Sequence, residues 1–133
     1  MPNAPMVLDM QDADVLFYKA FFSEDDSANY FQTLQNIISW EQQEIKIYGK
    51  QIKIPRLTAW YGDADQNYSY SGISHEPLPW TDELLEIKSA IETVTDVQFN
   101  SVLLNLYRDG SDSVGWHSDD EPELGQDPVI ASV

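Results

Sequence analysis

Cysteine is absent from the 133 residues of this chain. Its absence excludes disulfides, thiolate metal sites and thiol nucleophiles together. No apolar run approaches the roughly 18 residues that a membrane-spanning helix requires. Residues 1–6 carry neither a basic flank nor an apolar core, so they do not resemble a secretory signal. These absences predict a cytoplasmic protein without a membrane segment.

Basic residues are scarce: 7 Lys and Arg stand against 23 Asp and Glu, a formal net charge of -16. Such a charge repels a phosphate backbone unless the few cations are clustered. Four of the basic residues do cluster along the chain: Lys46, Lys50, Lys53 and Arg56. The cluster indicates either a local positive patch on an acidic body or charged strand edges that deter aggregation.

Length and an apolar content of 42% predict one globular domain. We expect, in chain order, a loose tail over 1–13, a strand over 15–18, a helix that Ser23 caps, a hairpin over 44–54, a strand over 57–61, a polar aromatic loop over 67–72, a helix that Thr81 caps, and strands over 99–107 and 129–133. Strands on both sides of a helix predict an α+β, mainly β domain.

Both predicted helices carry apolar residues at helical spacing, which predicts a buried stripe on each. The stripe of the first helix comprises Tyr30, Phe31, Leu34, Ile37 and Ile38. That of the second comprises Leu84, Ile87, Ile91 and Val94.

The strand over 99–107 is apolar on both faces, which predicts a strand buried between layers or in a barrel wall. Asn105 interrupts this pattern, and Tyr107 lies two residues on, on the same face. An unpaired buried amide costs about 1–3 kcal/mol. Asn105 therefore either bonds to neighbouring backbone or faces a polar ligand.

His117 and Asp119 follow the Asp109-Gly110 turn and would project to one side of an extended segment. An imidazole and a carboxylate supply two thirds of the 2-His-1-carboxylate set that leaves open positions on Fe(II). The alternatives are a solvated acidic loop and a Ca²⁺ or Mg²⁺ site made by the consecutive acids. His75 lies in a loop and is expected to be exposed rather than ligating. Phosphate-binding loops, dinucleotide-type glycine patterns and a serine nucleophile elbow are absent.

With these motifs the sequence resembles the AlkB-like family of Fe(II)- and 2-oxoglutarate-dependent dioxygenases, which oxidatively dealkylate nucleic acids. The likeness runs from about residue 55 to the C-terminus, in matching order and spacing. Its most specific pieces are Pro55-Arg56, Tyr61-Gly62-Asp63, Tyr68-Ser69-Tyr70-Ser71-Gly72, Asn105-Leu106-Tyr107-Arg108-Asp109-Gly110, His117-Ser118-Asp119-Asp120-Glu121 and Ile130-Ala131-Ser132-Val133.

The resemblance implies a role for each matching residue. His117 and Asp119 correspond to the first two iron ligands and are thereby catalytic, and Asn105 and Tyr107 correspond to the pair that binds 2-oxoglutarate. The substrate-binding residues it implies are Tyr68, Tyr70, Asp120, Glu121 and Arg56. The tyrosines would belong to a lid over a flipped-out base, the acids would lie near a cationic methylated base, and Arg56 and the neighbouring lysines would meet phosphates.

The implied fold is an incomplete double-stranded β-helix (jelly roll), preceded by a helix and a β-hairpin substrate lid. Residues 1–133 would form one dioxygenase-like domain, with an N-terminal extension and nucleotide-recognition lid over 1–80. The jelly-roll core would begin over 81–133.

The implied activity is alkylation-damage repair: with Fe(II), 2-oxoglutarate and O2, N-alkylated bases in DNA are demethylated and formaldehyde is released. The partner would be single- or double-stranded DNA, with RNA as the alternative, and the protein would be a monomer. The family's second iron-ligating histidine and its 2-oxoglutarate-anchoring arginine have no match in this chain. We therefore expect a C-terminally truncated member that is inactive alone. Two other functions stay open: a related dioxygenase acting on a non-nucleic-acid substrate, and a non-catalytic acidic module that binds divalent ions.

Overall fold

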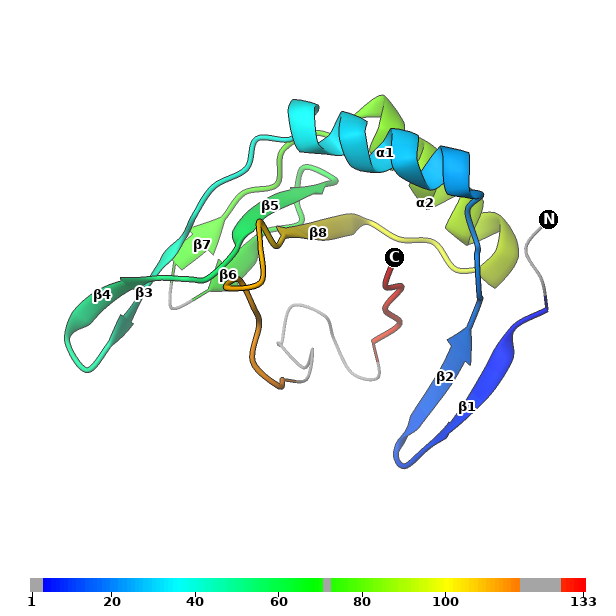
Figure 1. Cartoon of the computed structure of the whole chain (residues 1–133), viewed down its shortest axis with the longest axis horizontal. Coiled ribbons are helices and arrows are strands. Elements are labelled where there is room, and N and C mark those ends of the chain that lie inside the picture. The colour runs from blue at the N-terminus through cyan, green and yellow to red at the C-terminus, as the bar shows by residue number, and fades with distance from the viewer. Residues whose placement is uncertain (1–3, 71–72, 118–127) are drawn as a thin grey trace. The chain divides into compact units, whose positions relative to one another are not determined.

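The computed structural model describes residues 4–70, 73–117 and 128–133 (Figure 1). Its elements in chain order are β1 (Met6–Met10), β2 (Ala13–Phe17), α1 (Glu24–Ile37), β3 (Glu44–Ile47), β4 (Lys50–Lys53), β5 (Leu57–Gly62), β6 (Tyr68–Tyr70), β7 (Ile73–His75), α2 (Asp82–Thr95) and β8 (Ser101–Leu106). They fall into two compact units, Met1–Ile37 and Ile38–Val133. The described part is mainly β with two helices, which confirms the coarse fold class. One domain over 1–133 stays a prediction.

The first unit begins with an antiparallel hairpin in which β1 pairs with β2. Met10 pairs with Ala13, so a two-residue turn joins the strands, and Asp12 adopts a φ of 58° there. Aspartate tolerates this left-handed conformation better than most residues. The expectation of a loose tail over 1–13 is therefore wrong, because the strand directly after these residues serves as their pairing partner.

The start of α1 agrees with the prediction from sequence. The Asp26 N–H donates to the Ser23 hydroxyl oxygen at 3.1 Å, which satisfies one of the open donors at the helix start. Acidic residues fill the first turn, where the helix dipole favours negative charge.

The predicted buried stripe is confirmed only in part: Tyr30 and Leu34 are half-buried, and Ile38, directly after α1, is buried. Phe31 is 63% exposed, Ile37 is 44% exposed, and no residue of the helix is buried. Within this unit an aromatic neighbour, Phe22, lies edge-on to Tyr30 with ring centroids 5.6 Å apart. Apolar periodicity shows which face of a helix is available for packing, and nothing in the described part of this unit covers that face completely.

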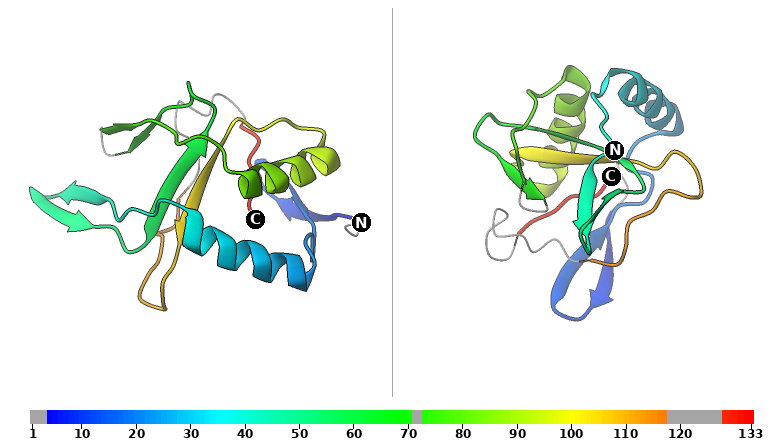
Figure 2. Two further views of the ribbon diagram at one scale, coloured as in Figure 1. Left: turned by 90° about the horizontal axis from the view of Figure 1, so that it is seen from above. Right: turned by 90° about the vertical axis from the view of Figure 1, so that its left-hand side faces the viewer.

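In the second unit, β5 has neighbours on both of its edges. It pairs antiparallel with β8, from Leu57 opposite Leu106 to Gly62 opposite Ser101 (Figure 2). On the other edge, isolated bridges join Glu41 to Thr58 and Leu78 to Tyr61. This central position explains why the strand contributes half of the small buried core, which comprises Ile38, Ile54, Thr58, Ala59, Tyr61 and Leu84.

Helix α2 lies in the chain between β5 and β8 and begins as its sequence predicts. The Leu84 N–H donates to the Thr81 hydroxyl oxygen at 3.1 Å, and Leu84 is only 4% exposed. The other three predicted inward residues, Ile87, Ile91 and Val94, are half-buried.

The Glu92 carboxylate links the end of α2 to the segment before β8. The Phe99 N–H donates to Glu92 Oε2 at 2.7 Å, and Lys88 Nζ lies 2.9 Å from the same oxygen. The hydrogen bond from Phe99, followed by that from Lys88, lowers the pKa of Glu92 below its ordinary value. Glu92 therefore ties the last turns of the helix to the segment that enters β8.

Two further predictions from sequence are wrong. The loop expected over 67–72 contains strands: β6 pairs antiparallel with β7, with Tyr68 opposite His75. The strand expected over 129–133 has no regular structure, and Val133 is 83% exposed, because no neighbouring strand pairs with it within the described ranges. The described strands pair only in twos, so the jelly roll stays a prediction. In the described part of the chain no helix is long and apolar enough to cross a membrane.

Candidate active site

Strand β8 presents the two residues that the family resemblance assigns to 2-oxoglutarate. Asn105 is exposed, Leu103 is 40% exposed on the same face, and Tyr107, directly after the strand, is 45% exposed. The opposite face, with Leu104 and Leu106, is half-buried. The expectation of a strand buried on both faces is thus wrong, because no layer covers the Asn105 face within the residues that the structure describes.

Arg56 contacts the carbonyl oxygen of the Asn105 side chain. Its Nε–H donates to Asn105 Oδ1 at 3.1 Å, across 49 positions of sequence. The expected alternatives for Asn105 were neighbouring backbone or a polar ligand, and the structure instead gives it a cationic side-chain donor. One feature of the sequence bears on this pair. Arg56 directly precedes β5, and Asn105 lies near the end of β8 that pairs with the start of β5.

Arg56 also reaches the loop that follows β8. Its Nη1 lies 3.4 Å from the Ser113 carbonyl oxygen, and the Ser113 N–H donates to the Pro55 carbonyl at 2.8 Å. The side chain is half-buried. Residues 55–56 therefore hold both β8 and the loop that runs on toward His117.

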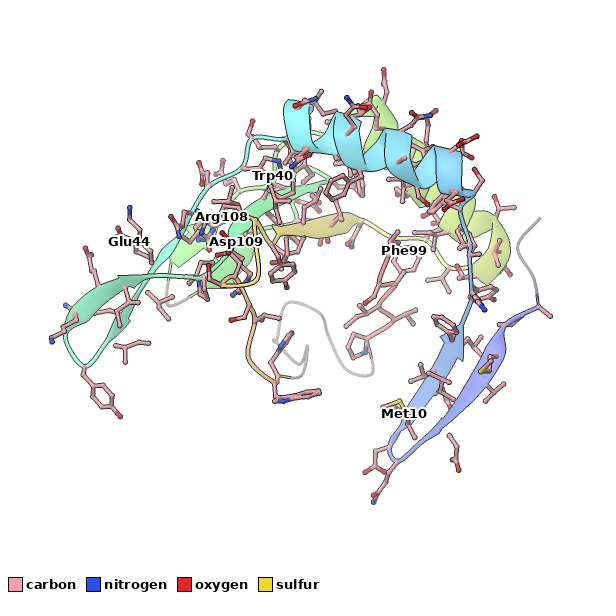
Figure 3. All side chains as sticks on the ribbon, in the orientation of Figure 1. Met10, Trp40, Glu44, Phe99, Arg108 and Asp109 are labelled. Atoms are coloured by element: carbon pink, nitrogen blue, oxygen red, sulfur yellow. The ribbon has the colours of Figure 1, made fainter. Side chains whose placement is uncertain are left out.

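The first part of this loop is closed by Arg108 and Asp112. Arg108 Nε donates to Asp112 Oδ2 at 2.7 Å and its Nη2 to Oδ1 at 3.0 Å, a bidentate pair. This contact raises the pKa of Arg108 and lowers that of Asp112. Hydrogen bonds from Ser111 likewise lower the pKa of Asp109. Arg108 and Asp109 lie together where the chain leaves β8 (Figure 3), so the predicted turn is confirmed.

His117 ends the described part of this loop and is exposed. Its Nδ1 lies 2.8 Å from the Gly115 carbonyl oxygen. A carbonyl only accepts, so this hydrogen bond requires the proton on Nδ1 and leaves the ring lone pair on Nε2. That tautomer is the one in which metal-binding histidines are usually held, so His117 fits the role of an iron ligand.

The remaining predicted site residues are less fully described. Asp119, Asp120 and Glu121 lie outside the described residues. The side chains of Tyr68 and Tyr70 also lie outside them, although the backbone of both belongs to β6. Residues 4–70, 73–117 and 128–133 contain no group of three or more metal-binding side chains.

A small cavity that the sequence did not predict runs along β5. Its volume is about 140 Å³, and its lining includes Glu41, Thr58, Trp60, His75, Glu76 and Leu103. The Thr58 hydroxyl is buried and has no hydrogen-bond partner in the described part of the chain. His75 is half-buried in β7, so the expectation of an exposed loop histidine is wrong.

The cluster of lysines lies on the β3–β4 hairpin, which the sequence correctly predicts. Ile45 pairs with Ile52, and Tyr48 and Gly49 make the turn, where Tyr48 is fully exposed. Lys46, Lys50 and Lys53 are all exposed. Neither of the ion pairs found in the described residues involves them, so their charge faces solvent.

Comparison with known proteins agrees with this picture. The profile of the family described as "2OG-Fe(II) oxygenase superfamily" matches residues 14–133. The chain is 45% identical over 114 residues to "Alpha-ketoglutarate-dependent dioxygenase alkB homolog 3" of Bos taurus, covering 85% of this chain and 39% of that protein. It is 37% identical over 119 residues to "DNA oxidative demethylase ALKBH2" of Homo sapiens, covering 87% of this chain and 46% of that protein. The chain thus spans less than half the length of these two relatives. Together, these matches show that the chain belongs to the 2OG-Fe(II) oxygenase superfamily, among its AlkB-like members.

Proposed function

We propose that these residues form part of the active site of an Fe(II)- and 2-oxoglutarate-dependent dioxygenase that removes N-alkyl groups from bases in nucleic acid, and so repairs alkylation damage. The observation that carries the proposal is the exposed face of β8, where Asn105 and Tyr107 follow one another at a spacing of two residues. The loop that leaves this strand reaches His117 after ten intervening residues, 107–116. A chain of this superfamily is expected to combine these groups around one metal.

Fe(II) would be held by His117 Nε2 and the Asp119 carboxylate, and 2-oxoglutarate would contact Asn105 and Tyr107. The Nδ1–H bond to Gly115 supports this assignment because it fixes the ring in a metal-binding tautomer. When bound, iron and 2-oxoglutarate would use O2 to oxidise an N-methyl group, which would then be lost as formaldehyde. The protein supplies position and electrostatics.

DNA would be the substrate, with RNA as the alternative to be tested. The exposed lysines of the β3–β4 hairpin, Lys46, Lys50 and Lys53, would meet phosphates even though the chain is acidic as a whole. Tyr70 would stack on an extruded base, with Tyr68 as a second aromatic of the lid, and Asp120 and Glu121 would favour a base that carries positive charge. Extrusion costs a few kcal/mol, which stacking and hydrogen bonds in the pocket offset.

The test measures formaldehyde and succinate from the complete gene product that contains this chain. The substrates are single-stranded DNA, double-stranded DNA and RNA that carry one N-methylated base, each against its unmethylated form. We expect methyl-dependent release, which His117→Ala and Asp119→Ala abolish and Lys19→Gln leaves unchanged. Succinate that is independent of every oligonucleotide would favour a dioxygenase with another substrate. Divalent-ion binding without 2-oxoglutarate turnover would favour a non-catalytic module.

The 133 residues alone are a second subject for the same assay. They contain 2 histidines, one of which is His75 in β7. We expect no turnover from residues 1–133, because His117 and Asp119 make only two thirds of the required ligand set. Methyl-dependent formaldehyde release by this piece would contradict the assignment of the ligands.

A further inference from the structure

We infer that Arg56 is a positioning residue, which turns the amide of Asn105 so that its N–H donors face 2-oxoglutarate. The inference rests on the proposed function, since that function supplies the ligand. It assigns Arg56 a role inside the co-substrate site in place of a contact to phosphate.

A side-chain amide has two different ends, and a carboxylate ligand can use only one of them. The carbonyl oxygen accepts hydrogen bonds, whereas the NH2 group donates two. 2-Oxoglutarate at neutral pH offers two carboxylates and a ketone, all of them acceptors. If Asn105 turned its oxygen outward, it would repel this ligand instead of binding it.

Arg56 removes that ambiguity. A guanidinium has donors and no acceptor, so its Nε–H, 3.1 Å from Asn105 Oδ1, is compatible with one orientation of the amide only. In that orientation the NH2 end points away from Arg56. The bond is also charge-assisted, which makes it stronger than a bond between neutral groups.

The backbone holds Arg56 in place for this task. Ile54, two residues earlier, is only 2% exposed, and the Arg56 N–H donates to its carbonyl oxygen at 2.9 Å. On the other side, Ser113 contacts both the Pro55 carbonyl and Arg56 Nη1. Arg56 is half-buried, whereas the three hairpin lysines are exposed. Arg56 therefore belongs with the residues that hold β8 and its following loop, and not with the exposed lysines of the hairpin.

The variants are chosen to separate charge from geometry. Arg56→Lys keeps the positive charge but lacks the planar group, and Arg56→Met removes both. Asn105→Asp keeps an acceptor for Arg56 but loses the NH2 donors, so it preserves the contact and removes the proposed function of the amide. Lys19→Met is the control, because it removes an exposed basic side chain that takes part in neither ion pair of the described residues and has no assigned role in binding.

Two measurements are made on the complete gene product. The first follows the side-chain NH2 resonances of Asn105 by NMR in protein labelled at asparagine, without metal or ligand. The second determines the dissociation constant of 2-oxoglutarate by calorimetry, with Mn(II) in place of Fe(II) so that no oxidation occurs.

We expect Arg56→Met and Arg56→Lys to shift the Asn105 NH2 resonances, and Lys19→Met to leave them unchanged. Loss of a charge-assisted bond and of the fixed orientation should weaken 2-oxoglutarate binding about 10-fold in Arg56→Met. Arg56→Lys should weaken it by a similar factor, Asn105→Asp by at least as much, and Lys19→Met less than twofold. The double variant Arg56→Met/Asn105→Ala should bind no more weakly than Asn105→Ala, because the two residues act through one contact.

Unchanged Asn105 resonances in Arg56→Met would overturn the inference whether or not 2-oxoglutarate binds. Shifted resonances with unchanged affinity, or effects that add in the double variant, would overturn it as well. If the substitution shifts the resonances but the wild type binds no 2-oxoglutarate, the proposed function itself fails, and the role of Arg56 toward this ligand fails with it.

Discussion

Gly62 and Ser101 face each other at the last register position of the β5–β8 pair, where no room is left for a side chain on Gly62. A Cβ placed on Gly62 would lie 2.7 Å from the Asn100 carbonyl oxygen and 2.8 Å from Ser101 Cα. Both neighbours are backbone atoms, which cannot turn aside as the end of a side chain can. Glycine is therefore required here by space and not by backbone conformation.

Gly62→Ala is accordingly expected to reduce the free energy of unfolding by about 1–3 kcal/mol, the usual cost of overpacking. Gly110→Ala is the matched control, because within the described residues no atom beyond its two chain neighbours lies within 4 Å of its added Cβ, and its effect should stay within about 0.5 kcal/mol. Urea unfolding of the two variants beside the wild type measures the difference. Equal stabilities would show that β8 shifts to make room.

Thr58→Val is expected to stabilise the protein, by about 1 kcal/mol, because it removes a buried hydroxyl that has no partner in the described residues. Thr58→Ser keeps the hydroxyl and loses a methyl group, so it should be less stable than the wild type by about 0.8 kcal/mol. Thermal unfolding of both variants decides the sign. A clear loss of stability in Thr58→Val would mean that the hydroxyl binds a water or a ligand in the cavity beside β5.

The Arg108–Asp112 pair predicts a pH dependence. Since the folded state lowers the pKa of Asp112, the unfolded chain binds a proton more readily there, with an ordinary pKa of about 3.9. The stabilisation is therefore fully present above that value and is lost as the pH falls through the lower folded-state pKa. We expect the difference in unfolding midpoint between wild type and Asp112→Asn to be largest near pH 7 and to shrink below pH 4. A difference that stays constant down to pH 2.5 would contradict the assignment.

The hairpin lysines predict a salt dependence of nucleic-acid binding. Replacing Lys46, Lys50 and Lys53 by Gln should weaken binding and reduce the slope of log K against log salt by about 0.7–0.9 for each phosphate that is no longer neutralised. Fluorescence anisotropy with a labelled single strand at several salt concentrations gives both quantities. Lys19→Gln, outside the hairpin, controls for net charge, and a slope that falls as much in that variant as in a single hairpin variant would refute a specific contact.

Local signals in the sequence predicted local structure well. The caps Ser23 and Thr81 each accept the expected backbone hydrogen bond, because capping depends only on residues within one turn. The β3–β4 register likewise follows from alternation around a two-residue turn. The superfamily was also identified from short motifs at fixed spacing.

What the sequence did not predict depends on partners far away in the chain. The strand expected over 129–133 did not form, and Phe31 and Ile37 of the expected stripe on the first helix are exposed. In both cases the apolar pattern indicates a capacity for burial and does not supply the covering layer. The partner of Asn105 was missed for the opposite reason: a half-buried Arg56 near a cluster of lysines has the same sequence signature as a solvent-facing cation. Only the register of β5 against β8 distinguishes the two.

The Glu92 carboxylate bears on the chemistry although it is remote from the proposed ligands. By accepting a hydrogen bond from Phe99, it ties the end of α2 to the segment that enters β8 two residues later. Side chains alternate along a strand, so a slip of one position would exchange Asn105 for a leucine on the outward face. If the proposed function holds, the length of the connection between helix and strand therefore matters for whether an amide or a leucine side chain would face 2-oxoglutarate.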